Sequence, residues 1–64
     1  GIYRLHEFFK VEQLIYGVLT SMPQSIDTIV LKTSLDASTV SATLTMLDLA
    51  GVAKNIGGGE WVRA

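Results

Sequence analysis

Apolar residues recur along this chain at helical spacing over most of its length and at alternating spacing near the C-terminus. Between residues 10 and about 21 they stand three and four positions apart, which predicts an amphipathic helix. Pro23 disfavours helical geometry at Met22 and is expected to stop this helix. The apolar stripe consists of Val11, Leu14, Ile15, Val18 and Leu19.

Two further helices are expected after Pro23. Ser25 is a good N-cap for a short helix over residues 26–33, and Asp36 caps a third helix from residue 37 to about 50. Gly51 supplies the left-handed conformation that commonly ends a helix. The residues expected to face inward are Ile26, Ile29 and Val30, then Leu35 in the connector, then Val40, Leu44 and Leu47.

The C-terminal residues predict a β-hairpin. Residues 52–56 alternate like a strand, residues 57–59 are glycines that make a flexible turn, and residues 60–63 return as the partner strand. Two strands alone are marginal in water, so the hairpin must pack on the helices through Val52, Ile56 and either Trp61 or Val62. The predicted fold is therefore mainly α with a small β-hairpin: a winged helix-turn-helix with three helices plus a two-stranded wing.

Residues 1–9 follow no single period, although Ile2, Leu5, Phe8 and Phe9 would share one face of a helix. We interpret them as a lead-in segment or linker before a winged-helix domain at residues 10–64. Their apolar side chains are expected to pack on that domain or on a neighbour. Since the chain begins at Gly1 without a methionine, we expect it to be a piece of a longer protein.

The size and charge of the chain narrow its possible functions. A chain of 64 residues forms one small domain, and its 48% hydrophobic content predicts surplus apolar surface for a partner. Six acidic residues oppose five basic ones, for a formal net charge of -1, whereas dedicated DNA-binding domains usually carry clustered Lys and Arg. No apolar run approaches the roughly 20 residues that span a bilayer. The absence of cysteine is compatible with a reducing cytoplasm.

The sequence contains no recognisable catalytic or metal-ligating pattern. His6 is the lone histidine and cannot make a metal site by itself, and no cluster of serine, histidine and acid is evident. A phosphate-binding loop needs Lys and Ser or Thr after its glycines, at the start of a helix, but Glu60 and Trp61 follow here in a strand. We therefore expect no enzymatic activity, no cofactor, no small-molecule substrate and no membrane partner.

The third predicted helix is the candidate recognition helix of a DNA-binding domain. It lacks Arg, Lys, Asn and Gln, which make bidentate contacts with bases, so sequence-specific readout is disfavoured. Hydroxyls and small side chains still permit weak, sequence-independent contact, aided by two cations on the phosphate backbone. The DNA-contact candidates are Ser38, Thr39, Ala42 and Thr45, with Lys54 and Arg63 on the phosphates. The alternative is that all of these are ordinary solvent-facing residues.

The same helix also offers a surface for protein contact. Met46 and Leu49 lie one turn apart on its outward side, and exposed methionine beside leucine is a common adaptable contact surface. In the alternative, the N-terminal segment folds back and covers them. The protein-interface candidates are Met46, Leu49, Phe8 and Phe9. Two roles are open for Trp61: stacking on a base of single-stranded DNA, or closing the core.

The stretch from Ser25 to Arg63 resembles the C-terminal winged-helix domain of DprA/Smf proteins. The resemblance rests on Leu35-Asp36, Val40-Ser41, Leu44, the run Met46-Leu47-Asp48-Leu49-Ala50-Gly51-Val52, the glycine-rich turn and Trp61-Val62-Arg63. Members of that family are cytoplasmic bacterial proteins that bind incoming single-stranded DNA during natural transformation and help to load the recombinase. Most of that work belongs to a Rossmann-like domain, which this chain lacks. The family's wing often carries basic residues, whereas residues 57–60 have none.

The resemblance implies an accessory module of a DNA-processing protein. It would contribute weak DNA contact that is not sequence-specific, protein-protein contact, or both. The alternative is a pure protein-interaction or self-association module, in which a second copy of the chain or another protein is the partner and DNA is not bound.

Overall fold

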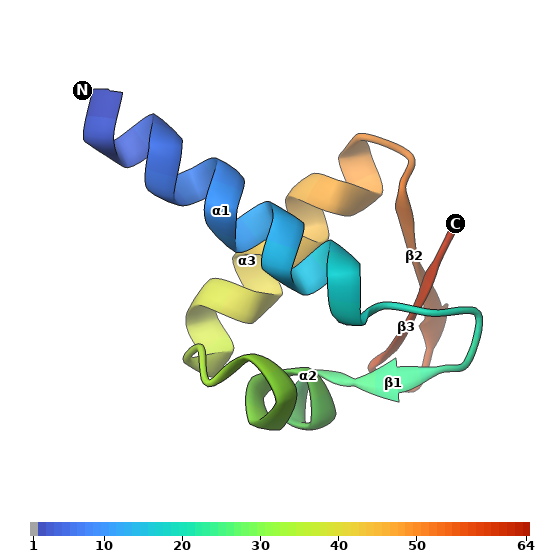
Figure 1. Cartoon of the computed structure of the whole chain (residues 1–64). Coiled ribbons are helices and arrows are strands. Elements are labelled where there is room, and N and C mark those ends of the chain that lie inside the picture. Colours follow the sequence, from blue (N-terminus) through green and yellow to red (C-terminus); the bar gives the residue numbers. More distant parts are fainter. Residues whose placement is uncertain (1) are drawn as a thin grey trace.

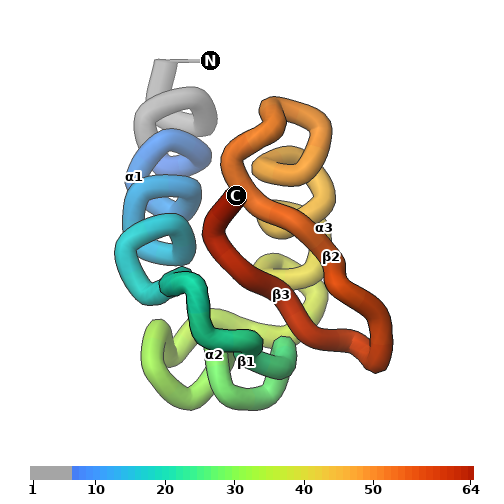
Figure 2. The backbone as a smooth tube through the Cα atoms, turned by 90° about the vertical axis from the view of Figure 1, so that its right-hand side faces the viewer, coloured from blue at the N-terminus to red at the C-terminus, as the bar shows by residue number. Residues whose placement is uncertain are grey.

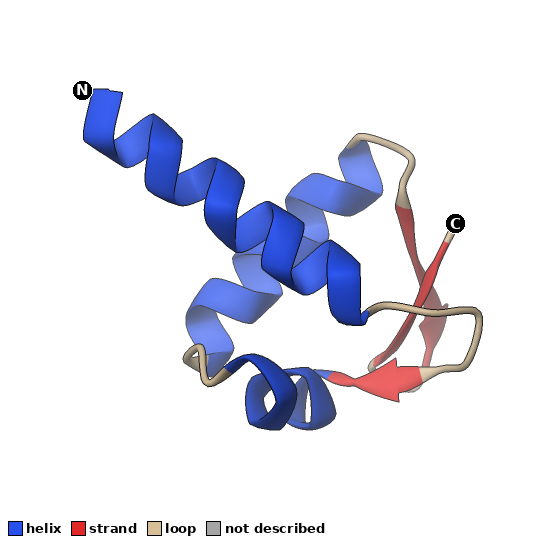
Figure 3. Cartoon of the chain, viewed as in Figure 1, coloured by secondary structure: helices blue, strands red, loops and turns tan. Residues whose placement is uncertain are grey.

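The computed structural model describes the backbone of residues 2–64 and the side chains of residues 7–64. Three helices pack together, and a small antiparallel sheet lies to one side of them (Figure 1, Figure 3). The helices are α1 (Ile2–Val18), α2 (Ile26–Thr33) and α3 (Ala37–Leu49). The strands are β1 (Gln24–Ser25), β2 (Ala53–Gly57) and β3 (Glu60–Arg63). This order agrees with the predicted helix-turn-helix followed by a wing.

The three helices contact one another pairwise, and the hairpin of β2 and β3 packs against α3. Figure 1 shows α1 crossing α3, with α2 at the other end of the helical layer from the N-terminus. Figure 2, turned by 90°, shows the hairpin running alongside α3. This arrangement leaves the N-terminal half of α1 and the outer side of α3 without a covering strand.

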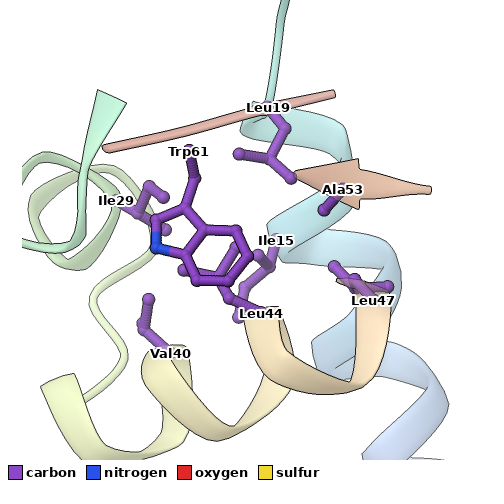
Figure 4. Close-up of a cluster of buried hydrophobic side chains, with 8 residues drawn as sticks. All are labelled: Ile15, Leu19, Ile29, Val40, Leu44, Leu47, Ala53 and Trp61. Carbon is purple, nitrogen blue, oxygen red and sulfur yellow. The ribbon is translucent and has the colours of Figure 1, made fainter. Parts of the chain in front are cut away.

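The core lies where α1, α2, α3 and the hairpin meet. Trp61, only 6% exposed, reaches from β3 over the helical side chains (Figure 4). The buried hydrophobic residues are Ile15, Leu19, Ile29, Val40, Leu44, Leu47, Ala53 and Trp61. Ile26 and Val30 of α2 and Leu35 of the connector, which were also predicted to face inward, pack partly buried against this cluster.

Local hydrogen bonds set the ends of α2 and α3 as the sequence predicts. The Ser25 hydroxyl accepts from the backbone N–H of Thr28 at 3.1 Å, and a carboxylate oxygen of Asp36 accepts from that of Thr39 at 3.0 Å. After α3, Gly51 has φ 79°, and the N–H of Val52 donates to the Leu47 carbonyl at 3.0 Å. This pairing is a Schellman motif, which satisfies the last carbonyls of the helix.

The first helix differs from its predicted bounds of 10 to about 21 at both ends. It begins at Ile2, because Phe8 and Val11 continue the apolar spacing that leads to Ile15. It ends at Val18, whose carbonyl accepts from Gln24 Nε2 at 2.7 Å, while the Thr20 carbonyl accepts from the Arg63 backbone N–H at 2.8 Å. The helix therefore ends before Pro23, and these bonds satisfy carbonyls at and just after its last residue.

The sheet has three strands in the order β1-β3-β2, so the predicted two-stranded wing is incomplete. The added strand is the two-residue β1, in which Gln24 pairs with Trp61 and Ser25 with Glu60. A segment this short carries no alternating pattern, so its extended conformation is set by the strand beside it. Residues 2–9 are helical, and their role as a lead-in or linker stays a prediction. The side chains of Ile2, Leu5 and His6 lie outside the described residues.

Strand register also overturns one predicted core contact. Ala53 faces the core at 2% exposure, and the bulge between Asn55 and Gly57 leaves Ile56 on the outside. The prediction for Ile56 is therefore wrong, while Val52 packs partly buried and Trp61 is the hairpin's main contact. Leu14, a member of the predicted stripe, is also exposed.

Two classes of feature are missing from the described part of the chain. Over residues 2–64, no helix combines the length and the apolar character needed to cross a membrane. Among the described side chains, no three from His, Cys, Asp and Glu gather closely enough to hold a metal ion.

Candidate functional site

A groove lies between the middle of α1 and α3. The two helices cross, so their N-terminal halves diverge (Figure 1). The open groove between the helices has a volume of about 630 Å³. Such a volume falls within the ~300–1,000 Å³ typical of binding pockets. The lining residues are Glu7, Phe8 and Val11 from α1 and Ser38, Thr39, Ala42, Thr43 and Met46 from α3. We call this feature the α1–α3 groove.

The α1–α3 groove is mostly apolar and has accessible apolar side chains along its edges. Thr43 is 4% exposed and Val11 packs against the core, so these residues lie deepest. Phe8 and Met46 are 38% and 45% exposed, one on each helix. Phe9 is also exposed, with its ring 6.1 Å from that of Phe8, and extends the apolar surface beyond the groove.

The groove joins residues that the sequence assigns to two different roles. Three DNA-contact candidates, Ser38, Thr39 and Ala42, share it with two protein-interface candidates, Phe8 and Met46. The remaining candidates are not among its lining residues. These are Thr45, Leu49, Phe9, Lys54 and Arg63.

The two remaining α3 candidates lie on its exposed surface outside the groove. The Thr45 hydroxyl donates to the backbone carbonyl of Ser41 at 3.0 Å, one turn earlier in the helix. Leu49 is 80% exposed, which confirms that Met46 and Leu49 both reach the surface. The N-terminal half of α1 leaves Leu49 exposed, so the predicted fold-back does not cover it.

The N-terminus of α3 carries a negative charge beside the groove. The Thr39 hydroxyl donates to Asp36 Oδ1 at 2.7 Å, and the Thr39 N–H donates to Oδ2 at 3.0 Å. These bonds hold the pKa of the Asp36 carboxyl below its ordinary value of 3.8, so it is ionised at neutral pH. The positive end of the helix dipole is thus already matched by a carboxylate, which opposes an approaching phosphate.

The cations of the sheet do not form one patch. Arg63 pairs with Ala53 across the strands, and Lys54 pairs with Val62. Because directly opposed residues share a face of a sheet, Arg63 lies on the helix side with Ala53 and Lys54 on the other side. The predicted adjacency of their strands is confirmed, but the two charges point to opposite faces.

Arg63 is engaged within the fold. Its Nη2 donates to the Tyr16 carbonyl at 2.8 Å, and its Cζ lies 4.1 Å from the centroid of the Tyr16 ring. Lys32 is engaged in a similar way, since its Nζ donates to Oε1 of the buried Gln24 at 2.8 Å. Lys54 is exposed on β2 and keeps its side chain available for a phosphate.

Trp61 closes the core and is not a stacking platform. Its ring lies among the core side chains (Figure 4), and at 6% exposure it leaves too little surface for a nucleic acid base to stack on. Of the two roles open to it from the sequence, the structural one is confirmed.

Three residues that line the groove were not predicted from the sequence as site residues: Glu7, Val11 and Thr43. Val11 was predicted only as part of the apolar stripe of the first helix. The signal for the α1 side was present, because Phe8 stands three residues before Val11 in the same helical stripe. Thr43 gave no signal, since a buried threonine looks like any other polar position on an amphipathic helix. The groove itself depends on the angle at which α1 crosses α3, which no local pattern encodes.

Comparison with known proteins adds one finding. A family model described as the DprA winged helix domain matches residues 10–59, which is more than half of the 64-residue chain. The matched span contains α2, α3 and β2 completely. No curated protein and no solved structure matches the chain.

Proposed function

The chain belongs to the DprA winged helix domain family, and on that premise we propose that it is a non-catalytic accessory module of a cytoplasmic DNA-processing protein. The module acts chiefly by protein contact through the α1–α3 groove. The observation that carries this proposal is the combination, in one concave surface, of exposed Phe8 and Met46 with the small side chains of Ala42 and Ser38. Concave apolar surfaces of this kind are typical binding sites.

The chemistry of α3 argues against DNA as its main ligand. Within Ala37–Leu49 the helix has no Lys, Arg, Asn or Gln, so it offers neither bidentate base contacts nor phosphate-neutralising charge. The ionised Asp36 stands at the helix end that would approach the backbone. A duplex docked on this face would meet a carboxylate where it needs a cation.

Weak DNA contact through the wing is the second candidate function. The observation that favours it is the exposed Lys54 on β2, on the sheet face away from the helices. One phosphate contact gives a shallow salt dependence, because each neutralised phosphate adds only about one unit to the slope of log K against log salt. Such contact is independent of sequence and adds to that of a larger DNA-binding protein.

Titration of the chain with short fluorescent duplex and single-stranded DNA distinguishes the two candidates. We expect dissociation constants no tighter than about 10⁻⁴ M at physiological salt, the weak end of non-specific binding. Lys54→Ala should remove the residual affinity, whereas Ala42→Phe, which fills the groove, should leave it unchanged. Micromolar binding that Ala42→Phe abolishes would overturn the proposal, since the groove would then be a nucleic-acid site.

A further inference from the structure

The charge around the α1–α3 groove selects among protein partners. Glu7 is the charged residue among those that line it, and Thr39, another lining residue, holds the Asp36 carboxylate within 2.7 Å of its hydroxyl. One carboxylate thus belongs to the α1 wall, and the other stands beside the groove, at the N-cap of α3. None of the described residues that line the groove is basic, so the charge that Glu7 and the neighbouring Asp36 place there is negative.

The shape of the groove suits a helix. It is bounded by two diverging helices whose facing side chains, Phe8 and Val11 against Ala42 and Met46, leave an apolar trough. The apolar face of an amphipathic helix fits such a trough with anchor residues at i, i+3 or i+4, and i+7. Ala42 is the smallest side chain on the α3 wall and gives one anchor room to approach the helix backbone.

Resting on the proposed role in protein contact, we propose that the α1–α3 groove binds a basic amphipathic helix of a partner protein, with its apolar anchors between Phe8 and Met46 and its Lys or Arg side chains at Glu7 and Asp36. Charge complementarity favours this occupant over a second copy of the chain. In the described part of the chain, α1 and α2 carry acidic as well as basic side chains, and α3 carries no basic one.

Three designed helical peptides test the proposal. Each has the same leucine anchors at i, i+4 and i+7, and the flanking positions are all Lys, all Glu or all Gln. Each is titrated into the ¹⁵N-labelled chain while amide shifts are followed. The Lys peptide should shift the amides of the groove residues and should bind at least ten-fold more tightly than the Glu peptide.

Matched variants locate the site and the charges. Ala42→Phe fills the groove and should abolish binding of the Lys peptide, whereas Thr45→Phe places the same ring on the same helix outside the groove and should leave it intact. Glu7→Gln and Asp36→Asn should each weaken the Lys peptide by about two- to five-fold, as expected for an exposed ion pair. Neither should change binding of the Gln peptide, and asparagine keeps the helix cap.

The outcomes separate this inference from the function it rests on. Equal binding of the Lys and Glu peptides, blocked in both cases by Ala42→Phe, would overturn the basic partner and leave protein contact at the groove standing. Binding that Ala42→Phe does not affect, or no binding of any peptide at millimolar concentration, would overturn both. A dimer seen by analytical ultracentrifugation and abolished by Ala42→Phe would assign the groove to a second copy instead.

Discussion

Replacing Arg63 by alanine is expected to reduce the stability of the fold and to leave any affinity for DNA unchanged. The guanidinium donates to the Tyr16 carbonyl at 2.8 Å and stacks on the Tyr16 ring. It thereby satisfies a carbonyl in the last turn of α1 and places positive charge at the negative end of the helix dipole. Both contacts join β3 to α1, two elements that are far apart in the sequence.

The expected loss follows from these two contacts. A hydrogen bond from a charged donor contributes about 1.5–3 kcal/mol and an exposed cation–π pair about 0.5–1 kcal/mol. Because the Arg63 side chain is solvent exposed, we discount both and expect a net loss of about 1.5 kcal/mol. In a domain of this size such a loss should lower the midpoint of thermal unfolding by roughly 6–12 °C. The total stability of the domain is about 3–10 kcal/mol.

Thermal and urea unfolding followed by far-ultraviolet circular dichroism measure the effect. Lys54→Ala is the matched control, because it removes a cation from the same hairpin and should change stability by less than about 0.5 kcal/mol. A double-mutant cycle with Tyr16→Leu isolates the stacking, for which we expect a coupling of about 0.5–1 kcal/mol. An unchanged midpoint for Arg63→Ala, together with DNA affinity reduced as much as in Lys54→Ala, would refute the reasoning and return Arg63 to the phosphate backbone.

Two further predictions concern α3. Because Leu44 is 0% exposed, Leu44→Ala should lower the free energy of unfolding, measured with urea, by about 2–5 kcal/mol. Leu49 lies on the same helix but is 80% exposed, so Leu49→Ala should lower it by less than about 0.5 kcal/mol. Equal losses would contradict the assignment of the two faces. The depressed pKa of Asp36 means that its ionised form stabilises the fold above pH ~4 and that this contribution disappears as pH falls through the folded-state pKa. The stability difference between the wild type and Asp36→Asn should therefore shrink between about pH 5 and pH 2, and a difference independent of pH would exclude the ionised cap.

The parts of the fold that the sequence predicts well are those with local causes. Ser25 and Asp36 cap their helices through side chains three residues from the N–H groups they accept from, and Gly51 ends α3 through its own φ. The bounds of α2 match, and α3 ends within one residue of the expected position. Each of these features is decided within a few residues, where a pattern can be read directly.

The parts that the sequence does not predict are decided by contacts between distant segments. The end of α1 depends on Gln24 and on pairing of Thr20 with Arg63, and β1 exists because β3 lies beside it. The inward face of β2 follows from its register with β3, which puts Ala53 inside and Ile56 outside. The sequence predicted that Arg63 contacts the phosphate backbone of DNA, whereas the strand register places its side chain on the helix side of the sheet, where it bonds to the Tyr16 carbonyl.

The two predicted surfaces of α3 overlap, and this overlap restricts what the module does at one time. Ser38 and Ala42 would face the groove of a duplex in the DNA-contact prediction, yet they line the same groove as Phe8 and Met46. A helix seated between Phe8 and Met46 would cover them, so α3 would not meet protein and DNA together. DNA contact by the occupied module would have to pass through the exposed Lys54, on the sheet face away from the helices. Protein docking and weak backbone contact are therefore compatible, whereas protein docking and insertion of α3 into a DNA groove exclude each other.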